Sequence, residues 1–189
     1  MNRCDWANAS DLEMRYHDTE WGVPIHDDHK HFEMLILEGA QAGLSWETVL
    51  RKREAYRKAF KGFDPQKVAR MTDNELELQL NNPGIIRNRL KVFSVRKNAR
   101  VFLEIQQAFN TFDAYIWSFV DGTPMNGLRK TLSDVPAKTV ISDAIAKDLK
   151  KRGMSFVGST IIYAYLQAAG LVNDHLMSCF RYADVKDLC

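Results

Sequence analysis

Residues 72–109 read TDNELELQLNNPGIIRNRLKVFSVRKNARVFLEIQQAF, which contains two helical segments joined by a short turn. Thr72 precedes Glu75 by three residues, the spacing of a capping box at the start of a helix. Asn82-Pro83-Gly84 interrupts the helical pattern, which resumes at about Ile85 and continues to the end of the stretch. The stretch, over about residues 72–108, therefore predicts a helix-hairpin-helix.

Helical spacing of apolar residues recurs on both sides of this stretch, whereas the alternation typical of strands is scarce. Residues 32–39 place their apolar side chains on one face of a helix, and residues 158–170 are apolar nearly all round, as in a buried helix. The expected helix starts are Asp28, Ser45, Asp64-Pro65, Asp113 and Ser142. We therefore predict an all-α fold.

The chain has 189 residues, of which 46% are hydrophobic and 26% charged, so it can bury its own core and is not a disordered chain. We expect one domain over residues 1–189, acting as a monomer. Residues 161–172 are the most apolar stretch, but Gln167 interrupts them and they are shorter than the ~20 residues of a membrane-spanning helix. The first residues lack the apolar segment of a signal peptide, and three scattered cysteines do not make a disulfide framework. The sequence thus predicts a cytoplasmic protein without a membrane segment, and it assigns no role to Cys189.

Basic and acidic residues are unevenly distributed, although the net charge is only +2. Residues 1–50 contain three basic and ten acidic residues, whereas residues 51–100 contain 14 basic and five acidic ones. Within the second group, residues 87–100 carry six basic residues and no acid. Such a segment is typical of a surface that binds a phosphate backbone, and it is equally typical of a solvated helix face.

The turn Gly84-Ile85-Ile86-Arg87-Asn88 lies at the start of this basic segment. A glycine allows a tight turn and can leave backbone N–H groups open beside the positive end of the next helix. That arrangement binds phosphate without reading a base sequence. The alternative is a plain turn between two packed helices, because Pro-Gly turns are common.

Residues 1–20 and 170–180 contain four potential metal ligands. They are Cys4, His17, His175 and Cys179. The last two are four residues apart, so on a helix they would share one face. Two thiolates and two imidazoles suit a tetrahedral zinc ion, which would join the two segments and, having four protein ligands, would be structural. The alternative is two unrelated buried cysteines and two surface histidines.

An aromatic and acidic cluster is the candidate for chemistry. Trp6, Tyr16, Trp21 and Trp46 fall within the first 46 residues, and Glu38 ends an apolar helical turn between them. Aromatic faces beside a carboxylate would bind a planar cation by stacking, cation–π attraction and charge-assisted hydrogen bonds. The alternative is a set of core aromatic residues and a surface glutamate.

Taken together, these residues resemble the 3-methyladenine DNA glycosylase I family, within the helix-hairpin-helix DNA glycosylase superfamily. The resemblance spans residues 3–179. It rests on Arg3-Cys4-x-Trp6, Tyr16-His17-Asp18-x-Glu20-Trp21-Gly22-Val23-Pro24, Leu37-Glu38-Gly39-x-Gln41-Ala42-Gly43-Leu44-Ser45-Trp46, Gly84-Ile85-Ile86-Arg87-Asn88, Trp117-Ser118-Phe119-Val120, Lys150-Lys151-Arg152-Gly153, Phe156-Val157-Gly158, Gly170-Leu171-Val172-Asn173-Asp174-His175 and Cys179.

The resemblance implies an enzyme that excises N3-methyladenine from double-stranded DNA and leaves an abasic site. It implies a structural zinc ion on the four cysteine and histidine residues. The implied base-recognition residues are Glu38, Tyr16, Trp46 and Trp6. The implied DNA contacts are Gly43 and Leu44, in a loop that enters the gap left in the duplex, and Gly84, Ile85, Ile86, Arg87 and Asn88, in an anchoring hairpin.

The chemistry of the substrate fits this expectation. A damaged base must leave the stack before an enzyme can reach it. N3-methylation leaves adenine positively charged, so its glycosidic bond breaks without a strong general acid. No lysine stands out for a Schiff base, so we expect a monofunctional enzyme without strand cleavage. The hairpin lacks the second glycine typical of the wider superfamily, and that superfamily's catalytic aspartate is not identified; both absences agree with the narrower family.

One position departs from the family pattern, because Glu13 stands where the family often has a pocket tyrosine. We expect Glu13→Tyr to strengthen binding of free 3-methyladenine. Two other functions stay open: a zinc-stapled helical DNA-binding module without catalysis, and a glycosylase for another alkylated base. A pure backbone binder would not need Glu38 among aromatic rings.

Overall fold

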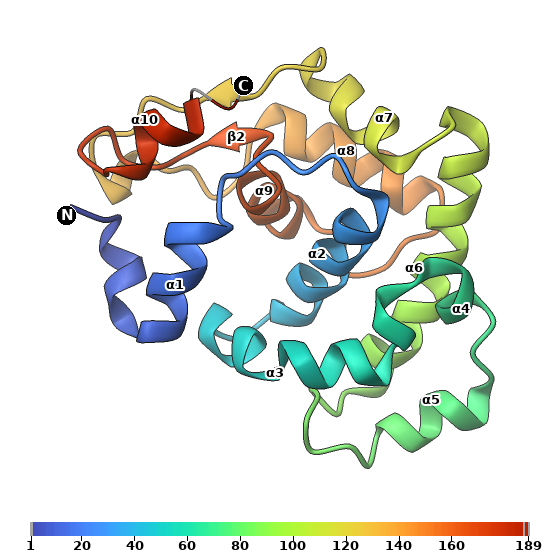
Figure 1. Cartoon of the computed structure of the whole chain (residues 1–189). Helices are drawn as coiled ribbons and strands as arrows, with labels where there is room; N and C mark the ends of the chain where they lie inside the picture. The colour runs from blue at the N-terminus through green and yellow to red at the C-terminus, as the bar shows by residue number, and fades with distance from the viewer. Residues whose placement is uncertain (1, 187, 189) are drawn as a thin grey trace.

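The computed structural model describes residues 2–186 and residue 188, and it is built mainly of helices (Figure 1). The α-helices are α1 (Asp11–Thr19), α2 (Asp28–Gln41), α3 (Trp46–Ala59), α4 (Pro65–Ala69), α5 (Asp73–Gln79), α6 (Arg89–Phe109), α7 (Phe112–Trp117), α8 (Val140–Lys151), α9 (Ser159–Ala168) and α10 (Arg181–Lys186). The 3-10 helices are η1 (Asp5–Ala9), η2 (Lys61–Phe63), η3 (Ser118–Val120) and η4 (Leu132–Asp134). Two short strands, β1 (Met125–Asn126) and β2 (Val172–Asn173), pair in parallel. The prediction of a mostly helical fold is confirmed, with this strand pair as an unpredicted addition.

Helices α2 and α9 contact each other at the centre of the molecule (Figure 1). Helix α1 and the C-terminal segment lie on one side of this pair, and α3 to α6 lie on the other. A core of buried apolar side chains extends from Tyr16 to Val172. In the part of the chain that the structure describes, none of the helices has both the length and the apolar character needed to cross a membrane.

Side-chain caps place several helix starts where the sequence predicted them. The Thr72 hydroxyl accepts a hydrogen bond from the Glu75 N–H, and the Glu75 carboxylate accepts one from the Thr72 N–H, which completes the capping box of α5. Asp27, Ser45 and Asp64 likewise cap α2, α3 and α4. These acceptors satisfy amides that have no partner within the helix.

Two helices begin earlier than predicted. Thr111 rather than Asp113 caps α7, because the Asp113 carboxylate accepts from the buried His31 imidazole instead. Thr139 rather than Ser142 caps α8, and Ser142 is the third helical residue, whose hydroxyl accepts from the Thr139 N–H at 2.8 Å. In both cases the side chain that the sequence predicted as the cap, that of Asp113 or Ser142, makes a different hydrogen bond.

The turn between α5 and α6 is longer than predicted, because α6 begins at Arg89 and not near Ile85. Asn88 caps α6 by accepting from the Lys91 N–H at 3.0 Å. Ile85 is buried in the core, and its N–H donates to the Asn82 carbonyl at 3.3 Å. Burial of this side chain therefore holds the segment in a turn that lies against the core rather than in a helix.

Gly84 is required for space rather than for an unusual backbone conformation. A Cβ at this position would lie 2.7 Å from the Cβ of Ala55 on α3. Its N–H donates to the Asn82 side chain at 2.9 Å, and the Ile86 N–H donates to the Tyr56 hydroxyl at 3.3 Å. The prediction that this turn leaves its amides open to a phosphate is therefore wrong for Gly84 and Ile86.

The segment after β2 is not the helix that the sequence predicted for His175 and Cys179. It forms a turn in which the Cys179 N–H donates to the Leu176 carbonyl at 2.7 Å, and α10 begins only at Arg181. The Phe180 N–H donates to the Asn2 carbonyl at 3.0 Å, which joins this turn to the N-terminal segment.

Candidate functional site

Cys4, His17, His175 and Cys179 meet in one buried cluster, although they come from opposite ends of the chain. Their ligand atoms all lie within 4.8 Å of one another. Cys179 Sγ lies 3.5 Å from His17 Nε2 and 3.7 Å from His175 Nδ1, and Cys4 Sγ lies 3.7 Å from the same Nδ1. The four predicted ligands thus form a group that could hold a metal ion, and the alternative of surface histidines is wrong.

Neighbouring groups hold both imidazoles of this cluster in place. His17 Nδ1 lies 2.8 Å from Asp18 Oδ1, and Asp18 in turn accepts from the Arg3 guanidinium at 2.8 and 2.9 Å. His175 Nε2 lies 3.0 Å from the Trp21 carbonyl oxygen, which can only accept. Each imidazole therefore carries its proton on the nitrogen that faces away from the sulfur atoms, the tautomer that a metal ligand needs.

The two sulfur atoms are held by contacts of their own. The Leu176 N–H donates to Cys4 Sγ at 3.4 Å. A hydrogen bond from the Cys4 thiol lowers the pKa of the Cys179 thiol. A thiolate is the form of cysteine that binds metals, so the cluster offers a closed set of two sulfur and two nitrogen donors.

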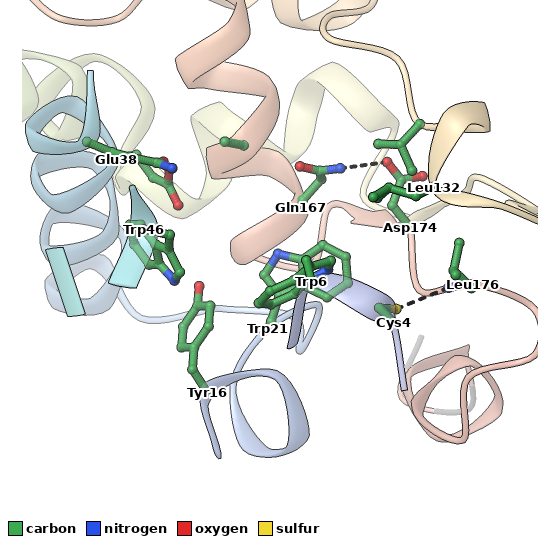
Figure 2. Close-up of a pocket in the computed structure, with 13 residues that line it drawn as sticks. Cys4, Trp6, Tyr16, Trp21, Glu38, Trp46, Leu132, Gln167, Asp174 and Leu176 are labelled. Atoms are coloured by element: carbon green, nitrogen blue, oxygen red, sulfur yellow. Dashed lines mark hydrogen bonds between the residues drawn. The ribbon is translucent and has the colours of Figure 1, made fainter. Parts of the chain in front are cut away.

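A cavity of about 280 Å³ opens beside this cluster (Figure 2). All four predicted base-recognition residues line it: Trp6, Tyr16, Glu38 and Trp46. Figure 2 shows the last three facing the same space from α1, α2 and α3. Cys4 also lines the cavity, so the cluster and the cavity share a wall.

The Glu38 carboxyl group is the unusual feature of this cavity. It is only 4% exposed, and burial raises its pKa to about 8. Of the described side chains, four have a buried polar atom without a hydrogen-bond partner, and three of these atoms belong to the cavity: Glu38 Oε2, the Tyr16 hydroxyl and Trp46 Nε1. Buried polar groups are rarely left unpaired, so three in one cavity indicate a polar ligand.

Aromatic rings surround these three atoms. The Tyr16 and Trp46 ring centroids lie 5.3 Å apart, and those of Trp6 and Trp21 lie 5.1 Å apart with nearly perpendicular planes. Burial, and next the charge of Glu38, raise the pKa of the Tyr16 hydroxyl well above 10, so this group stays a neutral donor. The cavity therefore combines ring faces, a hydroxyl donor, an indole donor and one carboxyl group.

An ion-pair network joins the helices that carry these residues. Arg53 on α3 donates to Glu20, at the end of α1, at 2.9 Å and to Glu33 on α2 at 2.7 Å. Lys30 on α2 also donates to Glu20, at 3.2 Å. These contacts lie behind Tyr16, along a second cavity that this ring also lines. They fix α1, α2 and α3 relative to one another.

Several residues that line the cavity were not assigned to base recognition, among them Gln41, Asp174 and Trp21, of which only Trp21 was named in the aromatic cluster. Trp21 lies just after α1, four residues beyond His17, and Asp174 directly precedes His175, so proximity to the predicted ligands was the available signal. Asp174 accepts hydrogen bonds from Arg129, Gln167 and Tyr163, which no sequence spacing could have indicated.

Glu13 is not among the residues that line the cavity. It lies on α1 beside Glu47 on α3, where burial and next the charge of Glu47 raise its pKa, while a hydrogen bond from the Glu47 backbone lowers it. The structure thus gives no support to the expectation that position 13 faces the base.

The predicted DNA contacts differ in their exposure. Gly43 and Leu44 lie in an exposed turn between α2 and α3, with Leu44 41% exposed. In the hairpin, Ile85 is buried, whereas Arg87 and Asn88 are exposed. The basic residues of α6 are largely engaged within the protein: Arg89 pairs with Glu77 and Arg96 with Asp73. Among the described residues, Arg87 has no hydrogen-bond or ion-pair partner.

Comparison with known proteins identifies the family of this chain. The model of the methyladenine glycosylase family matches residues 6–182. The chain is 50% identical to DNA-3-methyladenine glycosylase 1 of Escherichia coli (strain K12), over 98% of this chain and 100% of that protein. Its structure is similar to a crystal structure of a 3-methyladenine DNA glycosylase I, with a TM-score of 0.92 and 51% identity over 95% of this chain and 98% of the other.

A second solved structure describes 3-methyladenine recognition by 3-methyladenine DNA glycosylase I from Staphylococcus aureus. It has a TM-score of 0.92 and 37% identity, over 95% of this chain and 96% of that one. The matches cover nearly the whole chain and include the segments that build both the cluster and the cavity. The resemblance seen in the sequence motifs is confirmed: the chain belongs to the methyladenine glycosylase family.

Proposed function

We propose that this protein is a base-excision repair enzyme that hydrolyses the N-glycosidic bond of 3-methyladenine in alkylated, double-stranded DNA and leaves an abasic site. The observation that carries the proposal is the cavity that places three unpaired polar atoms, from Glu38, Tyr16 and Trp46, among aromatic rings. Its relatives bear the corresponding name, and one of them is described as recognising 3-methyladenine.

Charge explains how the cavity would select its base. The buried Glu38 carboxyl is neutral until a positive charge enters the cavity, because its pKa is about 8. A base made cationic by N3-methylation favours the ionised form of Glu38 over the protonated form. The carboxylate and the cation then attract each other in a cavity where little water screens their charges. Neutral adenine offers no such charge. Stacking on Tyr16 and Trp46 adds cation–π attraction to the same discrimination.

The bond exchange needs only a water molecule. The bond between the sugar carbon C1′ and the base nitrogen breaks, and its electron pair neutralises the cationic base. The sugar, which then has oxocarbenium character, takes the water oxygen at C1′, and the water proton passes to solvent. The cavity contributes by holding the extruded base through the reaction.

The DNA side of the proposal rests on two segments. The exposed turn that carries Gly43 and Leu44 enters the gap left by the extruded nucleotide. The hairpin of residues 84–88 holds the backbone through Arg87 and through the amides at the start of α6, rather than through the amides of Gly84 and Ile86, which are bonded internally. A helix-hairpin-helix role for residues 72–108 is part of this proposal.

Zinc is the metal that the buried cluster fits. Bonds of about 2.3 Å to sulfur and about 2.0–2.1 Å to nitrogen in a tetrahedron separate sulfur from nitrogen by about 3.6 Å. Three of the four sulfur–nitrogen pairs of the cluster are separated by 3.5 or 3.7 Å. When bound, the ion would link residues 1–20 to residues 170–180 and contribute to folding. With four protein ligands it leaves no position for a reacting water molecule.

The remaining parts of the proposal concern the state of the protein. We propose that residues 1–189 act as one domain, which the continuous core supports. We also propose that the protein acts as a monomer in the bacterial cytoplasm, together with the chromosomal DNA.

The experiment that tests the function is chromatography of the free bases that the purified protein releases from N-methylated duplex DNA. We expect release of 3-methyladenine while 7-methylguanine stays in the DNA. Release of a different alkylated base would favour the second candidate, a glycosylase of other specificity. No release by zinc-loaded protein that still binds DNA would favour a binding module, although such a module has no use for the unpaired atoms of the cavity.

A further inference from the structure

Lys91, on the first turn of α6, reaches the end of α2. Its Nζ donates to the carbonyl oxygens of Ala40 at 2.9 Å and Ala42 at 2.6 Å. The last carbonyls of a helix have no partner within it, and an ammonium group there also interacts favourably with the helix dipole. The side chain is half-buried, and this burial lowers its pKa. Lys91 therefore ties the helix after the hairpin to the end of α2.

The backbone that Lys91 holds is the turn carrying Leu44. The Leu44 N–H donates to the Gln41 carbonyl at 2.6 Å, Ala42 has φ −45° and ψ 111°, and Gly43 has φ 80°. These values describe a type II turn, which needs a residue with positive φ at its third position. Among the described residues, no other side chain from outside the turn donates a hydrogen bond to its carbonyls.

The alternative role for Lys91 is a direct contact to a DNA phosphate. Two of its three ammonium protons already go to carbonyl oxygens. The exposed Arg87, two positions before α6, has no partner among the residues that the structure describes and is the better candidate for a phosphate. Two residues of one basic segment therefore differ in what they can bind. The Arg87 side chain is available to a DNA phosphate, whereas the Lys91 ammonium group is bonded to the carbonyl oxygens of Ala40 and Ala42.

We propose that Lys91 is a positioning residue that couples the DNA-anchoring hairpin to the turn carrying Leu44, and holds that turn in the shape that fills the space left by an extruded base. The inference rests on the proposed function. It means that the Lys91 side chain connects the segment that binds the DNA backbone, at the start of α6, with the turn that takes part in base extrusion, at the end of α2. It also means that Lys91 serves extrusion rather than binding of the free base, because it does not line the cavity.

The test compares Lys91→Met with Lys91→Arg and with Arg87→Met as a matched control. In single-turnover excision at saturating protein, we expect Lys91→Met to be slower by about tenfold, the factor that corresponds to one hydrogen bond from a charged group. Fluorescence of 2-aminopurine placed beside the target base should show less extrusion. Affinity for free 3-methyladenine and the salt dependence of DNA binding should match the parent. Lys91→Arg, which keeps the donors, should recover most of the rate.

The control variant should behave in the opposite way. Arg87→Met should weaken DNA binding and reduce its salt slope by about one, which is the property that Lys91→Met should leave unchanged. If Lys91→Met excises as fast as the parent, or if its defect is a reduced salt slope, the inference is overturned. If the parent itself releases no base, the proposed function fails first, so the two failures are distinguishable.

Discussion

Glu38→Gln tests the central feature of the site, a carboxyl group buried without a complete set of partners. The amide of glutamine is nearly the same shape and is neutral at every pH. The pKa of Glu38 is about 8 in the folded protein, against 4.5 for an ordinary glutamate. The folded state therefore keeps its proton at pH values where the unfolded state has lost it, so Glu38 makes the parent less stable as pH rises.

The size of this effect follows from the two pKa values. They differ by 3.5 units (8 − 4.5), and at about 1.4 kcal/mol per unit the cost reaches about 5 kcal/mol. The cost is absent below pH 4.5, increases between pH 4.5 and pH 8, and is complete above pH 8. Urea unfolding of parent and variant from pH 4.5 to pH 9 measures it, because the other titrating groups are common to both proteins. A difference in unfolding free energy that does not change with pH would refute the assignment of a buried carboxyl.

The same substitution makes a prediction about activity. A carboxylate about 4 Å from a cationic base gains about 4 kcal/mol at an effective dielectric of about 20. Ionising a group of pKa 8 at pH 7 costs about 1.4 kcal/mol, which leaves about 3 kcal/mol, or roughly a hundredfold in single-turnover excision. Above pH 8 the ionisation cost vanishes, so the advantage of the parent over the variant should increase by about tenfold from pH 7 to pH 9.

A matched control uses Glu54, which is exposed on α3. Glu54→Gln should excise base as the parent does and should show no pH-dependent gain in stability. Nonspecific DNA affinity should be nearly the same in all three proteins, because neither residue is a phosphate contact. Equal excision rates in Glu38→Gln and the parent would contradict the role of the carboxylate in recognising the base.

Three further predictions follow from other parts of the structure. Cys179→Ala should lose bound zinc on elemental analysis and lower the free energy of unfolding by several kcal/mol, as a chelator should do to the parent; native protein without zinc would contradict the metal assignment. Gly43→Ala should destabilise the protein by about 1 kcal/mol in urea unfolding, because φ is 80° there although space is open; an unchanged stability would show that the turn relaxes freely. Glu13→Tyr should leave the calorimetric affinity for free 3-methyladenine unchanged, since Glu13 is outside the cavity lining; tighter binding would restore position 13 to the base pocket.

Much of the site was predictable because its residue types are chemically specific. Cysteine and histidine in pairs suit zinc, and a carboxyl group among tryptophan and tyrosine suits a cationic ring. The structure brings these side chains together in one cluster and one cavity, and their roles stay predictions. The bond from Arg129 to Asp174 and the bonds from Lys91 to the end of α2 were not predictable, because they join residues that are 45, 51 and 49 positions apart along the chain.

Errors in the predicted helices share a cause. The capping box at Thr72 and the cap at Ser45 depend on residues only three positions apart, and the structure confirms both. The start of α6 was wrong because burial of Ile85 is a tertiary contact. The predicted helix at His175 was wrong because contacts of that turn with the N-terminal segment, including the bond from Leu176 to Cys4, replace helical hydrogen bonds.

The sequence by itself determined the helical class, most of the caps and the identity of the candidate ligands and base-recognition residues, since these depend on side chains within a few positions of each other or on side-chain chemistry alone. Only the tertiary structure decided that Glu38 is buried with an unpaired oxygen, that the hairpin amides are already bonded, and that Lys91 holds the turn of Leu44. Burial and pairing depend on which distant segments pack together. Desolvation, which raises the pKa of Glu38, therefore arises only when α1, α2 and α3 close around it.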